Sequence, residues 1–133
     1  MSKISDTNRL LNYRLKMLFK SHTAWVSQFK ISTPAHFKKL ANEATEAMDA
    51  PQDITEHADC LLVLFSAIQG AGFTLDEVVR AAQQKHLVNL TRQWNNKPDG
   101  TLQHIDICTC PRAMGLDNDE NGTAYCIACH MPV

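Results

Sequence analysis

The chain has 133 residues, of which 44% are hydrophobic and 20% are charged, and its formal net charge at pH 7 is -1. These values suit one globular domain and exclude a disordered chain. They also exclude a general attraction to nucleic acid, which needs many Lys and Arg side chains. The longest apolar run, residues 60–68, is shorter than the roughly 20 residues that span a bilayer, and the polar N-terminus lacks the apolar core of a signal peptide. We therefore expect a cytoplasmic protein that binds neither membranes nor nucleic acid.

Apolar residues recur at three- and four-residue steps in four successive segments, which predicts four amphipathic helices. The predicted helices cover residues 8–29, 35–50, 53–70 and 74–94. Pro34 suits the start of the second helix, Gly70 suits the end of the third, and Thr74 with Glu77 forms a capping box at the start of the fourth. The connections are short and no strand-like alternation precedes the tail, so we predict an all-α fold, a four-helix bundle.

The composition changes near residue 95, where turn residues, cysteines and an acidic loop at 117–122 replace the helical pattern. We therefore predict an all-α domain at residues 1–95 and a small cysteine-rich extension at residues 96–133.

Two pairs of carboxylates stand three residues apart on the second and third predicted helices, so each pair shares one helical face. The pairs are Glu43 with Glu46, and Glu56 with Asp59. The second pair lies among apolar residues expected to face the core, namely Ile54, Ala58, Leu61 and Leu62. Buried carboxylates are costly unless a cation binds them, and oxygen ligands without His or Cys suit Mg²⁺ or Mn²⁺. The alternative is a pair of ordinary solvated helix faces.

A polar stripe on the fourth predicted helix consists of Lys85, Asn89 and Arg92, at steps of four and three residues. Cationic and amide groups on one face can receive phosphate oxygens opposite bound metals. A solvated surface stripe would have the same pattern. The stripe indicates a phosphate-binding site only in combination with the two carboxylate pairs.

Residues 36–46, 56–62 and 85–94 together resemble the motifs of the MazG-like all-α nucleotide pyrophosphohydrolases. The order and spacing are most similar to the phage dATP/dGTP branch, which includes enzymes of viruses that replace adenine by 2-aminoadenine. The resemblance covers residues 37–104, including Asp99, Gly100 and His104. This chain has Asn42 where the broader family usually has a further Glu, and its gap between motifs is shorter, as in the compact phage branch.

The resemblance implies a fold, an activity and a ligand set. A member would cleave dGTP or dATP to the monophosphate and release pyrophosphate, and the diphosphates are an alternative substrate that the resemblance leaves open. Glu43, Glu46, Glu56 and Asp59 would bind catalytic Mg²⁺ or Mn²⁺, while Lys85 and Asn89 would help to hold the phosphates or the metal shell. Relatives assemble as homodimers or homotetramers, and a viral member would act in the host cytoplasm.

Four aromatic residues are candidates for stacking on a purine base or for filling the bundle: Trp25, Phe29, Phe37 and Trp94. We assign Phe29 and Phe37 to the core. Trp25 is the better stacking candidate, because Val26 and Phe29 already supply a core stripe on the first helix.

Four of the five cysteines form two close pairs in the last quarter of the chain: Cys108 with Cys110, and Cys126 with Cys129. Such pairs suit one tetrahedral structural Zn²⁺, and the alternative is a disordered tail with surface thiols. Cys126, Cys129 and His130 also match a haem attachment motif, which we reject because no export signal is present and other cysteines crowd the site.

Two other functions are compatible with a helical chain that carries carboxylates and clustered cysteines. A di-iron carboxylate bundle needs Glu-x-x-His pairs, and neither carboxylate motif has His in that position. A zinc-ribbon adaptor on an inert helical platform is the remaining alternative, although no basic patch surrounds the cysteines.

Overall fold

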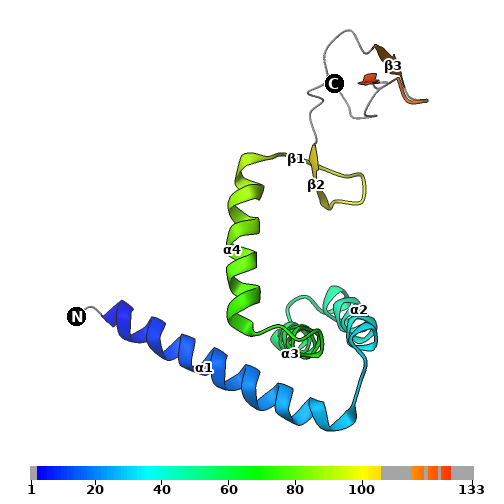
Figure 1. Ribbon diagram of the computed structural model, residues 1–133. Coiled ribbons are helices and arrows are strands. Elements are labelled where there is room, and N and C mark those ends of the chain that lie inside the picture. Colours follow the sequence, from blue (N-terminus) through cyan, green and yellow to red (C-terminus); the bar gives the residue numbers. More distant parts are fainter. Residues whose placement is uncertain (1–2, 106–114, 119, 123, 127–133) are drawn as a thin grey trace. The chain divides into compact units, whose positions relative to one another are not determined.

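The computed structural model describes residues 3–105, 115–118, 120–122 and 124–126 (Figure 1). It consists of two compact units, residues 1–82 and 83–133. The predicted boundary between residues 95 and 96 lies within a strand, Gln93–Asn96, and the predicted division into domains stays a prediction.

The four predicted helices are confirmed (Figure 1). They are α1 (Lys3–Val26), α2 (Thr33–Asp49), α3 (Ile54–Gly70) and α4 (Leu75–Thr91), with a short 3-10 turn η1 (Ser27–Phe29) after α1. Side chains cap three of the starts, because the first N–H groups of a helix have no partner within it. Ser32 accepts from the Ala35 N–H, Asp53 from the Thr55 N–H, and Thr74 from the Glu77 N–H.

The core of the first unit lies between α1, α2 and α3, with α2 packed along α3 and α1 against α3. Its buried apolar residues are Val26, Phe65, Ala67 and Ile68. Phe65 meets Phe19 of α1 edge-on at a ring-centroid distance of 5.2 Å, and His22 Nε2 lies 3.0 Å from Ser66 Oγ. Burial lowers the pKa of His22, and this effect outweighs the hydrogen bond with the Leu62 backbone, which raises it.

Several residues predicted to face the core are exposed instead. On α3, Ile54 is 80% exposed, and Ala58 and Leu61 are also exposed. Phe29 and Phe37, which we assigned to the core, are 58% and 51% exposed. The buried residues of α3 lie in its second half and are Phe65, Ser66, Ala67 and Ile68. An apolar residue on a helix is therefore not necessarily buried within a single chain.

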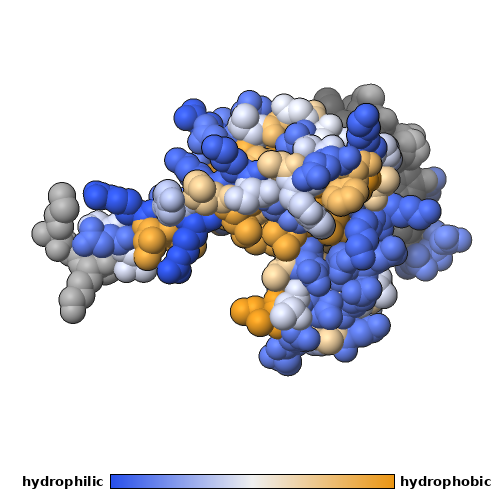
Figure 2. Space-filling view, turned by 90° about the horizontal axis from the view of Figure 1, so that it is seen from below, coloured by the Kyte–Doolittle hydropathy of each residue, from blue (hydrophilic) through white to orange (hydrophobic). Residues whose placement is uncertain are grey.

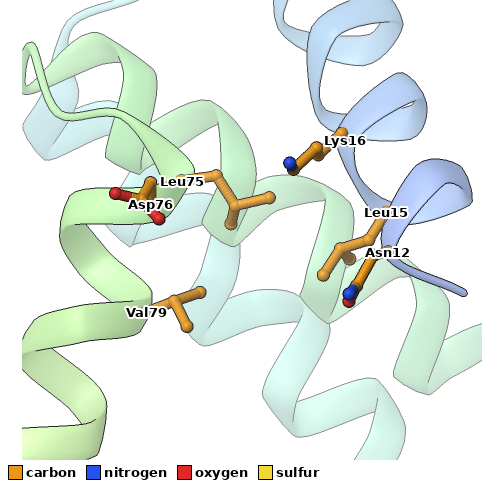
Figure 3. A pocket seen from close by; sticks show the side chains of 6 residues that line it. All are labelled: Asn12, Leu15, Lys16, Leu75, Asp76 and Val79. Carbon is orange, nitrogen blue, oxygen red and sulfur yellow. The ribbon is translucent and has the colours of Figure 1, made fainter. Parts of the chain in front are cut away.

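A pocket of about 260 Å³ in the first unit separates the N-terminal half of α1 from the start of α4 (Figure 3). Its lining residues are Asn12, Leu15, Lys16, Leu75, Asp76 and Val79. The apolar side chains of the two helices face a shared opening rather than interlocking (Figure 3). The closed four-helix bundle therefore stays a prediction, whereas the four helices themselves are confirmed.

The second unit contains strands, so the chain is mostly helical rather than all-helical. Strand β1 (Gln93–Asn96) pairs antiparallel with β2 (Leu102–Ile105), and β3 (Leu116–Asn118) pairs antiparallel with β4 (Ala124–Cys126). The β1–β2 turn is closed by the Gly100 N–H, which donates to the Lys97 carbonyl at 2.9 Å. Gly100 adopts a φ of +86° there, a conformation that glycine accepts readily.

The predicted fourth helix was therefore too long, because residues 93 and 94 belong to β1. The zinc prediction stays untested. Cys108, Cys110 and Cys129 lie outside the described residues, and only the backbone of Cys126 is described. Within the described ranges no single helix is long and apolar enough to cross a membrane, although α3 and α4 taken together pass that test of length and composition despite the bend between them.

Candidate active site

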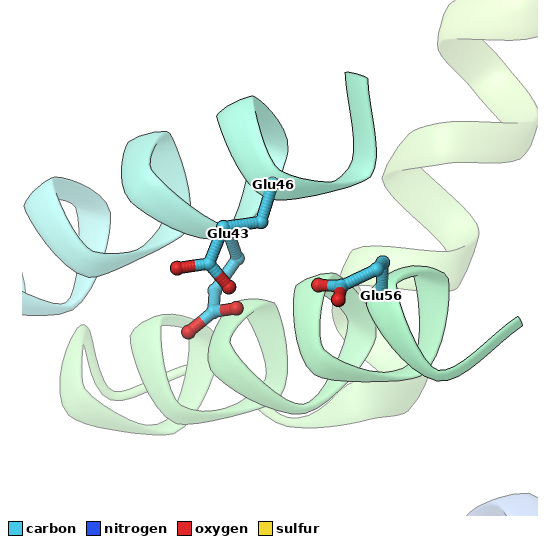
Figure 4. Close-up of side chains that lie close together, drawn as sticks. All are labelled: Glu43, Glu46 and Glu56. Carbon is cyan, nitrogen blue, oxygen red and sulfur yellow. The ribbon is translucent and has the colours of Figure 1, made fainter. Parts of the chain in front are cut away.

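Three carboxylates meet at the α2–α3 hairpin (Figure 4). Carboxylate oxygens of Glu43, Glu46 and Glu56 all lie within 4.8 Å of one another. The short link between the helices explains the meeting, since it places the last turns of α2 beside the first turn of α3. In Figure 4 the two side chains of α2 and the Glu56 side chain of α3 point toward a common space.

Glu43 is the buried member of this cluster, with 5% of its surface exposed. It forms an ion pair with Lys39, one helical turn earlier on α2. The hydrogen bond to Glu43 and the attraction of its charge raise the pKa of the Lys39 ammonium, and the charges of Glu46 and Asp59 raise it further. One carboxylate of the cluster is thus partly compensated by the protein itself.

Glu56 differs from Glu43 in that no ion pair to it is found among the described residues. Its Oε2 atom is buried, and within the described part of the chain this oxygen has no hydrogen-bond partner. Burial raises the pKa of Glu56, and the nearby charges of Glu46, Asp53, Asp59 and Glu43 raise it further. Such a group is costly unless a cation compensates it, and oxygen-rich clusters fit hard divalent ions. The residues present therefore fit a Mg²⁺ or Mn²⁺ site.

Asp59, the fourth predicted ligand, stands apart from the set of three whose oxygens converge. It is exposed on α3, one turn after Glu56. It still interacts electrostatically with both Glu56 and Lys39, so it contributes to the negative potential of the cluster. The structure thus brings three of the four predicted carboxylates together and places the fourth nearby.

Two residues of the predicted polar stripe, Lys85 and Asn89, lie on α4, whereas Arg92 follows the helix end at Thr91; all three belong to the second unit. Lys85 is exposed, whereas Asn89 and Arg92 are half-buried. The last two line a pocket of about 410 Å³ together with His86, Leu90, Trp94 and Leu102. His86 was not predicted to lie at this pocket. It stands three residues before Asn89, and this spacing places the two residues on one helical face.

Trp25 is 56% exposed on α1, as a stacking residue must be. Its indole lies near two rings of its own helical segment, His22 at 5.8 Å and Phe29 at 5.3 Å between centroids. The rings of His22 and Phe29 therefore pack beside the exposed indole. The role of Trp25 in base binding stays a prediction.

A family model described as dATP/dGTP pyrophosphohydrolase matches residues 18–107. The chain belongs to this family. The match includes the carboxylate cluster, the stripe on α4 and the β1–β2 hairpin, and it ends before β3. No curated protein sequence matches this chain significantly.

The dATP/dGTP pyrophosphohydrolase fold also has a solved counterpart. The chain is similar to the cyanophage S-2L MazG-like pyrophosphohydrolase, with 25% sequence identity and a TM-score of 0.56. The similarity covers 68% of this chain and 95% of that one, and the cyanophage enzyme was solved with dGDP and three catalytic Mn²⁺ ions per active site. These matches confirm the family resemblance that we inferred from the sequence. The chain is a nucleotide pyrophosphohydrolase of MazG-like fold, which sets aside the alternative of a zinc-ribbon adaptor on an inert helical platform.

Proposed function

We propose that this dATP/dGTP pyrophosphohydrolase cleaves dGTP and dATP between the α- and β-phosphates, at the site on the α2–α3 hairpin. The observation that carries the proposal is the convergence of Glu43, Glu46 and Glu56 within 4.8 Å, with one Glu56 oxygen buried and unpaired. A concentration of negative charge cannot receive a triphosphate without cations. The site therefore suits a substrate that arrives with divalent metals on its phosphates.

Glu43, Glu46, Glu56 and Asp59 would hold Mg²⁺ or Mn²⁺, Asp59 by a small change of its exposed side chain. Bound ions of this kind supply an activated water and neutralise the charge of the phosphates. The protein's own part is to fix the carboxylates on two helices, and Lys39 forms an ion pair with Glu43 at its end of the cluster.

Lys85, Asn89 and Arg92 would bind the phosphates, and Trp25 would stack on the base. The role of the stripe is supported by the half-buried side chains of Asn89 and Arg92, which line a pocket. The role of Trp25 is supported by its exposed indole. A planar guanidinium pairs with two phosphate oxygens at once, which suits Arg92 to this role.

Purified protein with Mn²⁺ or Mg²⁺ is expected to convert dGTP and dATP to the monophosphate and pyrophosphate in equal amounts. We expect both purines to react faster than dCTP and dTTP. Product chromatography of a panel of deoxy- and ribonucleotides measures both the products and the preference. The panel includes dGDP and dADP, because hydrolysis at the α-phosphate would release orthophosphate from them.

Two results would contradict this proposal. Release of single orthophosphates from dGTP, with dGDP as the first product, would place cleavage at the wrong bond. Equal rates for all bases would remove the purine preference while leaving the pyrophosphohydrolase in place. A metal-free sample with a chelator is the control, and it should show no turnover.

We also propose that the chain forms a homodimer or homotetramer. Large apolar side chains are exposed along every helix of the single chain, including Leu11, Leu18, Phe37, Leu64 and Leu87. Figure 2 shows such apolar surface, in orange, among the polar surface of one face. Exposed apolar area on this scale favours burial against another subunit.

The extension is proposed to bind one structural Zn²⁺ through Cys108, Cys110, Cys126 and Cys129. Thiolates select zinc while carboxylates select harder ions, so one chain can keep the two kinds of metal apart. Elemental analysis of protein purified under reducing conditions without added metal should find about one zinc per chain. Cys126→Ser should lose the zinc and retain some triphosphate turnover, whereas Cys60→Ser, the matched control in α3, should keep it. A zinc-free wild-type protein would refute the assignment.

A further inference from the structure

The end of α4 is tied to the β1–β2 hairpin by a tryptophan. The Asn89 carbonyl accepts from the Arg92 N–H at 3.3 Å and from the indole Nε1–H of Trp94 at 2.8 Å. The last carbonyls of a helix have no partner within it, so a side-chain donor at this place fixes both the helix end and the start of the following strand. The indole contact thus joins the end of α4, at Thr91, to β1, which begins at Gln93.

Trp94 is itself held by the opposite strand. In the β1–β2 ladder Trp94 pairs with His104, and the two rings meet edge-on at 5.7 Å between centroids. Directly paired residues on one face of a hairpin stabilise each other. The indole is therefore fixed at its ring by the hairpin and at its N–H by the helix.

The same indole borders the pocket that Asn89 and Arg92 line. The Asn89 Oδ1 atom is buried, and no hydrogen-bond partner of it is found among the described residues. A buried, unpaired amide oxygen is a costly arrangement that a bound cation or a hydrogen-bond donor can compensate, whereas the Nδ2 group of the same amide is the donor available to a phosphate oxygen. The geometry of this pocket depends on the last turn of α4, where the Trp94 hydrogen bond acts.

We propose that Trp94 is a positioning residue, which holds Asn89 and Arg92 in the geometry that binds the phosphates of the nucleotide. This inference rests on the proposed substrate role of the α4 stripe. Without the indole N–H the last turn of α4 loses its anchor, and the Asn89 and Arg92 side chains sample more orientations. Because the stripe binds the phosphates in ground and transition states alike, the loss falls on substrate binding rather than on the chemical step.

Trp94→Phe keeps an aromatic ring beside His104 and removes the N–H donor. We expect KM for dGTP to rise by about fivefold while kcat changes by less than about twofold, the scale of one hydrogen bond. Thr91→Val is the matched control, since the Thr91 hydroxyl donates to the Val88 carbonyl at 2.7 Å in the same turn and Thr91 is not among the pocket's lining residues. It should leave KM unchanged. A general weakening of the helix end would raise KM in both variants and would overturn the proposal.

A mutant cycle tests whether Trp94 acts through Asn89 and Arg92. In an Asn89→Ala/Arg92→Ala background Trp94→Phe should have no further effect on KM, or on the dissociation constant of dGMP measured by calorimetry if turnover is too slow. Additive effects, or a wild-type KM for Trp94→Phe, would overturn the positioning role. A wild-type KM for both Asn89→Ala and Arg92→Ala would instead refute the substrate role of the stripe.

A second variant keeps the test decisive if Trp94→Phe does not fold, as judged by circular dichroism. His104→Ala retains the indole N–H and removes the ring that Trp94 packs against. It should raise KM in the same direction by a smaller factor. An unchanged KM in this variant would then overturn the proposal.

Discussion

Glu46→Gln and Asp59→Asn are each expected to lower dGTP turnover by at least about a hundredfold. Both changes are nearly isosteric, and both side chains are exposed, so neither opens a cavity nor leaves a buried group unpaired. What each change removes is one negative charge from the site that would hold the metals. The measurement is kcat and KM for dGTP at saturating Mn²⁺, together with the melting temperature of each variant.

Asp49→Asn is the matched control, because Asp49 is an exposed carboxylate at the end of α2 that does not belong to the cluster. It should retain activity within about twofold, the small effect expected of a surface change away from the site. Near-wild-type turnover in Glu46→Gln or Asp59→Asn would exclude that residue as a metal ligand. The result for Asp59 is the more informative, since its oxygens are not among those that converge within 4.8 Å.

Glu56→Gln is expected to change stability in opposite directions with and without metal. The raised pKa of Glu56 means that its ionised form is less stable in the folded chain than in the unfolded chain. Neutral Gln relieves that cost, so the metal-free variant should melt at a higher temperature than the metal-free wild type at neutral pH. Added Mn²⁺ should stabilise the wild type, because a ligand at about 100 times its dissociation constant contributes roughly 2.7 kcal/mol. That corresponds to a rise in melting temperature of roughly 5–15 °C.

The variant should lose most of this metal-dependent rise, since it lacks one ligand charge. Melting curves by circular dichroism in chelator and in Mn²⁺ measure both effects on the same sample. Glu77→Gln, the same substitution at an exposed position in the first turn of α4, should keep the metal-dependent rise. A Glu56→Gln protein that melts lower than wild type in chelator would show that this carboxylate stabilises the fold. An unchanged response to Mn²⁺ would remove Glu56 from the ligand set.

The helices and their starts could be predicted from the sequence, because both depend on local patterns. Three- and four-residue periodicity identified four helical segments, and Pro34 and Thr74 marked where helices begin. The family was also legible, because the carboxylate pairs and the stripe stand in a specific order and spacing. The convergence of Glu43, Glu46 and Glu56 followed from two helical faces joined by a short link.

Burial and the end of α4 depended on tertiary contacts. Periodicity shows which residues share a face, but not whether another helix covers that face, so it could not tell that Ile54 is exposed while Glu43 is buried. The pattern of residues 74–94 favours one continuous helix, yet residues 93 and 94 form hydrogen bonds with a strand eight or more residues later. The Trp94 indole then satisfies the Asn89 carbonyl that a longer helix would have used. The sequence by itself determined the helices and the chemistry of the site, because these rest on neighbours in the chain, whereas contacts between distant residues decided which groups are buried, paired and held in place.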